Sequence, residues 1–342
     1  MKINNPKKII VRMPNWLGDA VMGTPILQDI KTALPETKLT VLCHEAIHNL
    51  LLQNPYIDDF IVFSREKKRQ NCEKRKIFTQ IKENSFDAGI LLTRSFSSAW
   101  WFFRTGVKNR IGFQDHFRSP LLTYAIPVPK NEEREHQVIT YKRLLEPLGI
   151  LRSDTGPELF LQQTEIEKAK KLLEEYGITE RHTLVGINPG AAFGSAKCWP
   201  PERFIALTKE LEKDPLIRVI YYGDKTGKPL IDDICRASTS RTVNLAAKTD
   251  LRTLIALISL SKVFISNDSG PMHVAAALKT PLVAIFGSTN EIKTGPYGVK
   301  EVIHKHVACS PCYARKCPTD FRCMKSITVQ DVLQATHTHL GK

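Results

Sequence analysis

The residues best suited to chemistry lie in the turn 267–273, Asn-Asp-Ser-Gly-Pro-Met-His, which joins an apolar segment to a run of small residues. This pattern predicts a buried strand followed by a helix, because Pro is tolerated in the first turn of a helix. Backbone N–H groups and the positive end of the helix dipole favour a phosphate there. Asp268 adds a carboxylate and His273 an imidazole, although both residues also fit simpler roles as a helix cap and a buried helix residue.

A similar junction lies near the N-terminus, where the apolar residues 9–11 lead through a turn to helical spacing over residues 20–34. Asp19 lies at the start of that helix, beside Gly18, which permits close approach of a ligand. Open α/β sheets bind ligands at the carboxyl ends of their strands, so the position suits a functional carboxylate. A helix cap is the alternative role for Asp19.

A third junction, residues 185–200, runs from an apolar strand into a loop rich in Gly and Ala. Small residues allow the backbone to approach a diphosphate, and Lys197 at the end of the loop supplies a positive charge for it. The loop matches neither the Walker A spacing nor the dinucleotide fingerprint. Because a lysine after such a loop is commonly solvated, this interpretation depends on the other two junctions.

Alternating helix and strand patterns position these junctions and predict an α/β fold of doubly wound sheets, in a chain long enough for two domains. In the first half we expect strands at 9–13, 38–43, 59–63 and 87–92 and helices at 19–34, 45–53, 76–84 and 96–105. In the second half we expect strands at 183–187, 217–222, 262–266 and 281–286 and helices at 201–213, 228–237, 250–260 and 271–278, with helices at 135–147 and 165–176 between the halves. The domains are then 1–160 and 180–327, with a hinge over 150–182 and a C-terminal helix in 328–342 that packs back on the first domain.

The chain carries a net charge of +14, which predicts an anionic partner. Basic residues gather at 65–69 and 74–76, and then at Arg94, Arg104, Lys108, Arg110 and Arg118. They fit a solvated helix face, a nucleic acid or an anionic lipid surface, but no nucleic-acid-binding motif accompanies them. Aromatic residues at 96–103, flanked by arginines, suit a membrane interface or a helix edge that faces the core. Residues 1–8 form no apolar signal segment and no run is long enough to span a bilayer, so we expect a cytoplasmic protein.

Eight cysteines fall into two groups. Cys43, Cys72, Cys198 and Cys235 are scattered, as free thiols of a reducing compartment are. Cys309, Cys312, Cys317 and Cys323 lie together with the spacing C-x2-C-x4-C-x5-C. This spacing leaves open a structural zinc site and free or reversibly oxidised thiols.

Three motifs together resemble those of the bacterial ADP-heptose:lipopolysaccharide heptosyltransferases. They are Leu-Gly-Asp-Ala-Val at 17–21 with Thr-Pro at 24–25, Asn-Pro-Gly-Ala at 188–191 with Lys-x-Trp-Pro at 197–200, and the turn 267–273. The resemblance extends from about residue 9 to the C-terminal helix, and heptosyltransferase II is the most similar subfamily. It implies a GT-B fold of two Rossmann-like domains facing a cleft, and an inverting glycosyltransferase that needs no metal or other cofactor.

The resemblance also implies a substrate pair. L-glycero-D-manno-heptose would move from ADP-heptose to heptose I of the lipopolysaccharide inner core, on a lipid A–Kdo–heptose acceptor at the inner face of the cytoplasmic membrane. The enzyme would be a monomer, peripheral at that membrane, with no nucleic-acid partner. The alternatives are a related heptosyltransferase (I or III) with another core acceptor, a non-catalytic nucleotide-sugar-binding protein and a basic nucleic-acid-binding protein.

The resemblance also implies roles for individual residues. A carboxylate must take the proton of the attacking sugar hydroxyl, and Asp19 matches the family's proposed base. Lys197 would stabilise the departing diphosphate. The donor-binding residues implied are Gly18, Asn188, Gly190, Ala191, Ser195, Gly223, Asp224, Thr249, Asp268, Ser269, Gly270, Pro271, Met272 and His273, and the acceptor-binding residues are Asn15, Trp16, Thr24, Arg94, Ser95 and Arg110. Ala192 and Phe193 replace a Thr-Thr pair of heptosyltransferase I, and Thr249 also departs from that subfamily, so heptosyltransferase II is favoured.

Overall fold

The computed structural model describes residues 2–64, 70–299 and 301–341, without the side chains of residues 70–72. The chain divides into two compact units, Met1–Leu159 and Phe160–Lys342. This division falls inside the predicted hinge region, 150–182. The basic cluster at 65–69 lies outside the described residues.

The first unit holds a parallel sheet in the order β3-β2-β1-β4-β5-β6. Its strands are β1 (Lys8–Arg12), β2 (Lys38–His44), β3 (Asp59–Phe63), β4 (Ala88–Leu91), β5 (Asn109–Phe113) and β6 (Tyr124–Ile126). Its helices are α1 (Leu17–Met22), α2 (Thr24–Ala33), α3 (Glu45–Leu51), α4 (Gln70–Asn84), α5 (Phe96–Arg104) and α6 (Gln137–Lys142), with 3-10 turns at Ser119–Leu121, Glu132–Arg134 and Arg143–Leu148. The strands read as continuous apolar runs because helices cover both faces of a parallel sheet.

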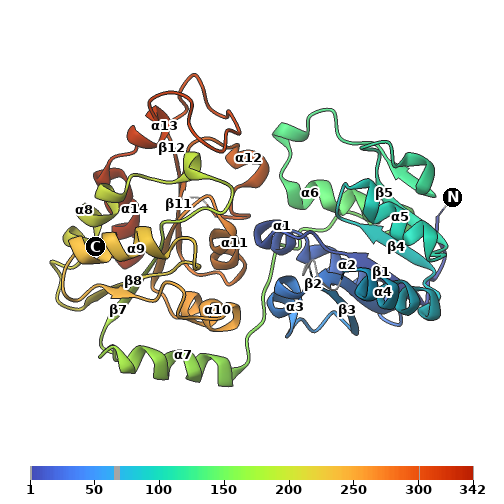
Figure 1. Cartoon of the computed structure of the whole chain (residues 1–342), viewed down its shortest axis with the longest axis horizontal. Helices are drawn as coiled ribbons and strands as arrows, with labels where there is room; N and C mark the ends of the chain where they lie inside the picture. The colour runs from blue at the N-terminus through green and yellow to red at the C-terminus, as the bar shows by residue number, and fades with distance from the viewer. Residues whose placement is uncertain (1, 65–69, 300, 342) are drawn as a thin grey trace. The chain divides into compact units, whose positions relative to one another are not determined.

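The second unit holds another parallel sheet, in the order β12-β11-β10-β7-β8-β9. Its strands are β7 (Thr183–Asn188), β8 (Ile217–Tyr221), β9 (Val243–Asn244), β10 (Val263–Asn267), β11 (Leu282–Phe286) and β12 (Val302–His304). Its helices are α7 (Gln163–Glu175), α8 (Pro201–Leu211), α9 (Lys228–Ala237), α10 (Leu251–Ser259), α11 (Gly270–Ala277), α12 (Glu291–Thr294), α13 (Arg322–Lys325) and α14 (Val329–Leu340), with a 3-10 turn at Ser195–Lys197. In Figure 1, α8, α9 and α14 lie on one side of this sheet and α10 and α11 on the other.

The two sheets have the same strand order. Counted from the first strand of each unit, both read 3-2-1-4-5-6, which is the Rossmann order. The order reverses between β1 and β4 in the first unit and between β7 and β10 in the second. Ligands of doubly wound folds bind at such switch points, outside the carboxyl ends of the strands. The topology therefore places the expected binding sites at the carboxyl ends of β1 and β4 and of β7 and β10. The predicted doubly wound α/β fold is confirmed.

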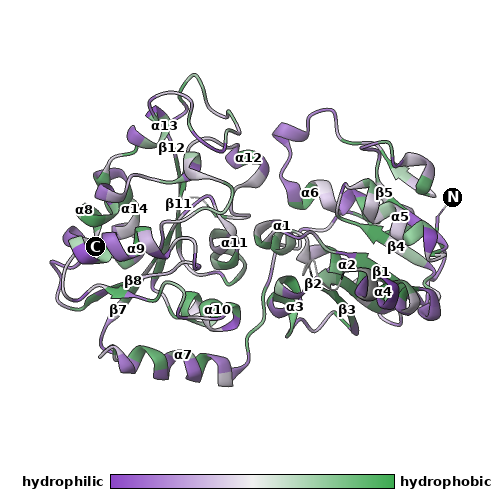
Figure 2. Cartoon of the chain, in the orientation of Figure 1, coloured by the Kyte–Doolittle hydropathy of each residue, from purple (hydrophilic) through white to green (hydrophobic). Residues whose placement is uncertain are grey.

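Alternation of side chains along the strands divides the core of the second unit into two layers. Val185, Ile187, Val263 and Ile265 face one buried cluster, together with side chains of α8, α9 and α14. On the other face, Gly186 lies against the ring of Phe264, where an added Cβ would approach it to 2.7 Å. Figure 2 shows the resulting pattern, with strongly hydrophobic strands inside each unit and polar faces on the helices around them.

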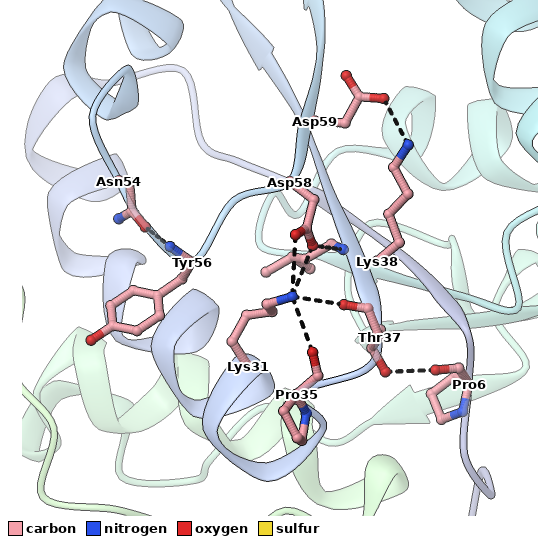
Figure 3. Close-up of polar contacts among 10 residues, drawn as sticks. Pro6, Lys31, Pro35, Thr37, Lys38, Asn54, Tyr56, Asp58 and Asp59 are labelled. Atoms are coloured by element: carbon pink, nitrogen blue, oxygen red, sulfur yellow. Dashed lines mark hydrogen bonds and ion pairs between the residues drawn. The ribbon is translucent and has the colours of Figure 1, made fainter.

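Polar contacts fasten the edge of the first sheet. Lys31, in the last turn of α2, donates hydrogen bonds to both carboxylate oxygens of Asp58 and to the carbonyls of Pro35 and Thr37 (Figure 3). Asp58 also accepts from the backbone N–H of Leu39, 2.7 Å away. One lysine thus fixes the loop between α2 and β2 against the start of β3.

Two predicted elements differ in a way that local chemistry explains. The helix predicted at 19–34 is interrupted at Gly23, because Pro25 has no N–H for the carbonyl of Val21 and the Thr24 hydroxyl bonds that carbonyl instead, at 2.8 Å. The helix predicted at 135–147 is α-helical only at Gln137–Lys142 (α6) and continues as the 3-10 turn Arg143–Leu148, which contains Pro147.

The C-terminal helix α14 belongs to the second unit. Its residues Val332 and Leu333 lie in the same buried cluster as Phe204 and Leu207 of α8. The prediction that this helix packs back on the first domain is therefore wrong for its apolar face, which completes the core beside β10 and β11.

Candidate active site

Two asparagines join the loops at the switch point of the second sheet. Asn188 ends β7 and donates from its amide to the carbonyl of Gly190 and to the hydroxyl of Ser269, both at 3.0 Å. Asn267 ends β10, donates to the carbonyl of Pro189 at 2.7 Å and accepts from the N–H of Trp199 at 3.1 Å. Both amides are buried. The sequence motifs at 188–191, 197–200 and 267–273 thus form one hydrogen-bonded unit.

A buried carboxylate and a lysine form the charged centre of this unit. Lys197 donates to Asp268 at 2.5 Å, and the Thr289 hydroxyl donates to the same carboxylate oxygen, also at 2.5 Å. The side chain of Asp268 is only 5% exposed and that of Lys197 13%. Because an ammonium group has three donors, Lys197 can bind an anion while it keeps its contact with Asp268.

The N-terminus of α11 presents backbone donors beside this pair. Its N-cap residue, Ser269, makes no side-chain cap, because its hydroxyl is bound by Asn188 and Ser266. Pro271 starts the helix, while Met272 and His273 are buried. The first N–H groups of a helix without a side-chain cap suit an anion, so Gly270 to His273 contribute through the backbone and the helix dipole.

The glycine-rich loop packs against the cysteine-bearing loop. The N–H of Ala196 donates to the carbonyl of Arg315 at 3.1 Å, and a Cβ on Gly194 would come within 2.2 Å of that carbonyl oxygen. Lys197 and Arg315 both lie over the ring of Phe193, at 4.9 and 5.3 Å from its centroid. Two cations therefore flank one aromatic ring next to Asp268. Gly190 is open to an added Cβ, and Ala191 and Ser195 are partly or fully exposed.

The predicted ribose and adenine contacts lie after β8 and before α10. Gly223 packs so closely on Ile231 that a Cβ would approach its Cδ1 to 2.4 Å. The Asp224 carboxylate accepts from Thr226 and from the N–H of Gly227, and these bonds lower its pKa although partial burial opposes the shift. Asp224 thus fixes the turn before α9. Thr249 is half-buried in the loop that precedes α10.

The switch point of the first sheet holds the predicted base. Asp19 lies half-buried in the first turn of α1, directly after Gly18. Burial, and then the negative charge of Asp19, raise the pKa of Tyr141 well above its ordinary value. Asn15 accepts from Arg12 at 2.9 Å, and Trp16 is 60% exposed at the start of the helix. A carboxylate and an exposed indole therefore lie at the start of α1, and the neutral phenol of Tyr141, from α6, is near enough to feel the charge of that carboxylate.

The remaining predicted acceptor residues have structural partners in the first unit. Arg94 pairs with Glu132 and lies 3.7 Å from Asp115, and Ser95 caps α5. The Thr24 hydroxyl, which bonds the Val21 carbonyl, also accepts from the N–H of Glu158. Arg110 donates to the carbonyls of Leu121, Val107 and Lys108. Arg94 and Ser95 follow β4 at the switch point, whereas Arg110 lies within β5 and holds a turn.

Thr289 and Arg315 are the site residues that sequence reasoning missed. Both follow strands of the second sheet: Thr289 lies shortly after the end of β11, and Arg315 lies in the loop after the edge strand β12. The available signal for Thr289 was its position after a strand that pairs with β10. Arg315 gave no such signal, because only the packing of one loop on another brings it to Phe193.

The four clustered cysteines do not form the tightest set of metal-binding groups. Among the described residues, that set is Glu291, His304 and His306, whose ligand atoms lie within 4.8 Å of one another. Cys309 and Cys312 are exposed, whereas Cys323 is buried. Hydrogen bonds from Thr319 lower the pKa of Cys317. No helix in the described part of the chain combines the length and the apolar character that crossing a bilayer requires.

Comparison with known proteins identifies the family. The model of glycosyltransferase family 9 (heptosyltransferase) matches residues 74–321. Lipooligosaccharide heptosyltransferase 2 of Haemophilus ducreyi is 30% identical over 308 residues, which cover 86% of this chain and 88% of the relative. Lipopolysaccharide heptosyltransferase 2 of Salmonella typhimurium is 29% identical, with 86% of each chain covered. The solved structure of E. coli ADP-heptose lps heptosyltransferase II superposes with a TM-score of 0.82 at 26% identity, covering 97% of this chain and 98% of that one. The chain belongs to glycosyltransferase family 9, the heptosyltransferases.

Proposed function

We propose that this enzyme transfers L-glycero-D-manno-heptose from ADP-heptose to heptose I of the lipopolysaccharide inner core, with inversion at the anomeric carbon. The observation that carries the proposal is the Lys197–Asp268–Thr289 group beside the N-terminus of α11. Its supports are the family and relatives named as heptosyltransferase 2.

The second unit would bind the donor. The diphosphate lies against Lys197 and the backbone N–H groups of Gly270 to His273, where ammonium and helix dipole both favour negative charge. As the bond between the anomeric carbon and the diphosphate breaks, charge grows on the β-phosphate, and these fixed donors stabilise that charge most in the transition state. Asp268 is held by hydrogen bonds from Lys197 and Thr289, and it accepts further hydrogen bonds from hydroxyl groups of the heptose.

These donors allow the chemistry to proceed without a metal ion. Lys197 lies 2.5 Å from Asp268, so a cation is already present where the leaving group gains charge. Arg315 also lies over the Phe193 ring, so it adds a second cation close to the glycine-rich loop. We propose that no metal or other cofactor takes part in the transfer.

The first unit would supply the base and bind the acceptor. Asp19 accepts the proton of the attacking hydroxyl group, while Tyr141 stays neutral and can donate a hydrogen bond beside it. An open pocket of about 490 Å³ in this unit is lined by Lys130, Arg134 and the ion pair of Arg143 with Glu135, and its remaining positive charge suits an acidic sugar acceptor.

Exposed aromatic residues of the same unit favour a membrane surface. Phe96 is 49% exposed, Phe103 50% and Phe117 97%. Lys74 lies over the Trp100 ring at 5.2 Å, and Arg110 over Phe103 at 5.4 Å. Aromatic side chains next to cations suit the headgroup region, so we propose a monomeric enzyme peripheral at the inner face of the cytoplasmic membrane.

One incubation tests the proposal. The purified full chain is mixed with ADP-heptose and a panel of truncated lipopolysaccharide cores, and the products are measured by mass spectrometry. We expect one heptose to be added to the core that ends in heptose I. Transfer only to a core that ends before heptose I, or beyond it, would assign the chain to a related heptosyltransferase. ADP-heptose binding with no transfer to any core would indicate the non-catalytic alternative.

A further inference from the structure

The most informative unassigned group is a histidine and glutamate cluster at the edge of the second sheet, defined as Glu291, His304 and His306. Glu291 is the first residue of α12, His304 ends β12, and His306 follows two residues later. The side chain of His304 is 3% exposed, that of Glu291 20% and that of His306 73%. The cluster takes no part in the transfer described above.

Hydrogen bonds fix which nitrogen of His304 carries a proton. Nε2 lies 2.9 Å from the Ser310 hydroxyl, and that hydroxyl donates its single proton to the carbonyl of Gly287. A carbonyl oxygen can only accept, so Ser310 must accept from Nε2–H. In the neutral imidazole, Nδ1 then carries a lone pair and no proton.

That lone pair faces a carboxylate. Nδ1 of His304 lies 2.7 Å from Oε2 of Glu291, and both atoms are acceptors when the ring is neutral and the acid ionised. Such a contact is stable only with a positive charge between the two atoms, either a proton or a metal ion. His306 brings a second imidazole to the same carboxylate: its Nε2 lies 3.5 Å from Oε1 of Glu291, and its ring centroid lies 4.3 Å from that of His304.

A metal ion satisfies all three groups at once. A divalent ion binds both imidazole rings in the neutral form and the carboxylate in the ionised form. Two imidazoles and one carboxylate are a ligand set of Zn²⁺ sites that keep an open position. The Ser310 hydroxyl supplies the second-shell hydrogen bond that orients a ligating histidine. His306, being exposed, can move the short distance needed to close the site.

We propose that Glu291, His304 and His306 form a three-ligand site for a divalent transition metal such as Zn²⁺, with one coordination position left open. The metal would act on the glycine-rich loop of the donor site through the cysteine-bearing loop. Ser310 begins the cysteine-bearing loop, whose Arg315 carbonyl accepts from Ala196 directly before Lys197. The metal would therefore hold the base of a loop that packs on the glycine-rich loop. This inference does not depend on the proposed function.

Calorimetric titration of the chelator-treated full chain with Zn²⁺ tests the site, because heat of binding is independent of activity. We expect one equivalent to bind. Glu291→Gln and His306→Asn, both at accessible positions, should each weaken binding by at least about 100-fold, and Ser310→Ala by about 10- to 100-fold without removing a ligand. His304 is not substituted, because its side chain is buried and a change there would test folding as well as metal binding.

A second variant separates this site from the thiols. Cys309→Ser with Cys312→Ser should bind Zn²⁺ as the unchanged chain does. If that variant loses binding while Glu291→Gln and His306→Asn keep it, the metal belongs to the cysteines and the proposal is wrong. If the unchanged chain binds no Zn²⁺, and the imidazole ¹⁵N spectrum shows His304 protonated on both nitrogens, a proton occupies the position and the proposal is likewise wrong.

Discussion

The sequence predicts which residues lie at the two switch points when those residues directly follow a strand. It predicts them less well when they belong to a loop that packs there from a distant part of the chain. Asn188, Asp268 and Lys197 follow strands or the loops between them, and the structure joins them by hydrogen bonds. Asp224 shows a case that side-chain type alone does not resolve. The resemblance implies a contact with the donor, which stays a prediction, and the carboxylate also caps the turn before α9.

Replacement of the proposed base tests the chemistry at this scale. Asp19→Asn keeps the shape of the side chain and removes its ability to accept a proton. We expect turnover to fall by about 100-fold or more, with ADP-heptose affinity little changed, because the base acts only as the hydroxyl attacks. Steady-state rates and calorimetry measure the two effects. Asp59→Asn, at an exposed pair with Lys38, is the control and should leave both unchanged. Normal turnover in Asp19→Asn would remove Asp19 from this role.

The charged group around Asp268 predicts a graded response to substitution. Lys197→Ala removes the cation that meets the diphosphate in ground and transition states, so ADP affinity and turnover should both fall. Thr289→Val removes only a hydroxyl donor to Asp268 and should cost about tenfold in donor affinity. ADP titration by calorimetry compares the two variants. Unchanged ADP binding in Lys197→Ala would contradict the assignment of the diphosphate to this loop.

At the scale of elements, the strands with long apolar runs were predictable and the short edge strands were not. β1, β2 and β10 agree with their predictions to within a residue or two, because four or more buried residues produce a clear signal. β9 has two residues and β12 three, too few for any periodicity. β5 escapes prediction because its first residues, Asn109 and Arg110, are polar.

An ion pair between α7 and α10 makes stability depend on pH. Arg252 binds both oxygens of Glu165 at 2.7 Å, and this bond is the main cause that lowers the pKa of Glu165 below 4.5. A carboxylate whose pKa is lower in the folded than in the unfolded state stabilises the fold at pH values above its unfolded-state pKa. This stabilisation is lost as the pH falls through the folded-state pKa. Glu165→Gln should therefore lower the free energy of unfolding by about 1–2 kcal/mol at pH 7, and by progressively less below pH 4.5.

Urea denaturation at a series of pH values measures this difference. Glu180→Gln is the matched control, because that glutamate is 91% exposed in its pair with Lys170 and should contribute nothing measurable. A constant difference between Glu165→Gln and the unchanged chain at all pH values would show that packing, not charge, accounts for the effect.

At the scale of the whole molecule, the charge and the fold class followed from composition and alternation of elements, whereas the membership of α14 did not. An amphipathic C-terminal helix can cover either domain, and only the complementary apolar face of α8 decides the question. The surplus of positive charge is likewise a property of the whole chain, but not every basic residue is exposed enough to contact a partner. Arg118 is fully buried, and burial lowers its pKa to about 10.

Vesicle binding tests the use of that charge. We expect the protein to sediment with vesicles that contain anionic lipid, and far less with neutral ones, at low salt. Binding should weaken as salt rises, since screening shortens the range of the attraction. Phe117→Ser removes the most exposed of the large apolar side chains named above and should reduce binding without altering transfer to a soluble core fragment. Equal binding to neutral and anionic vesicles would contradict an electrostatic role.

Chelation tests the proposed independence from metal. With EDTA at constant ionic strength, initial rates should remain near those of untreated enzyme, because Lys197 and helix N–H groups already stabilise the leaving group. Immediate loss that magnesium restores would contradict the proposed chemistry. A slow decline with loss of structure would instead follow from metal leaving a structural site, since such sites couple binding to folding.

The orientation of the Asn267 amide also makes this position intolerant of a carboxylate. Asn267→Asp would replace an N–H donor by a carboxylate oxygen 2.7 Å from the Pro189 carbonyl, with hardly any change in shape. Two oxygens cannot share that contact, so the loops at the switch point would separate although no atom of the fold had been lost. Calorimetry of Asn267→Asp should therefore show loss of donor binding, while the first unit remains intact.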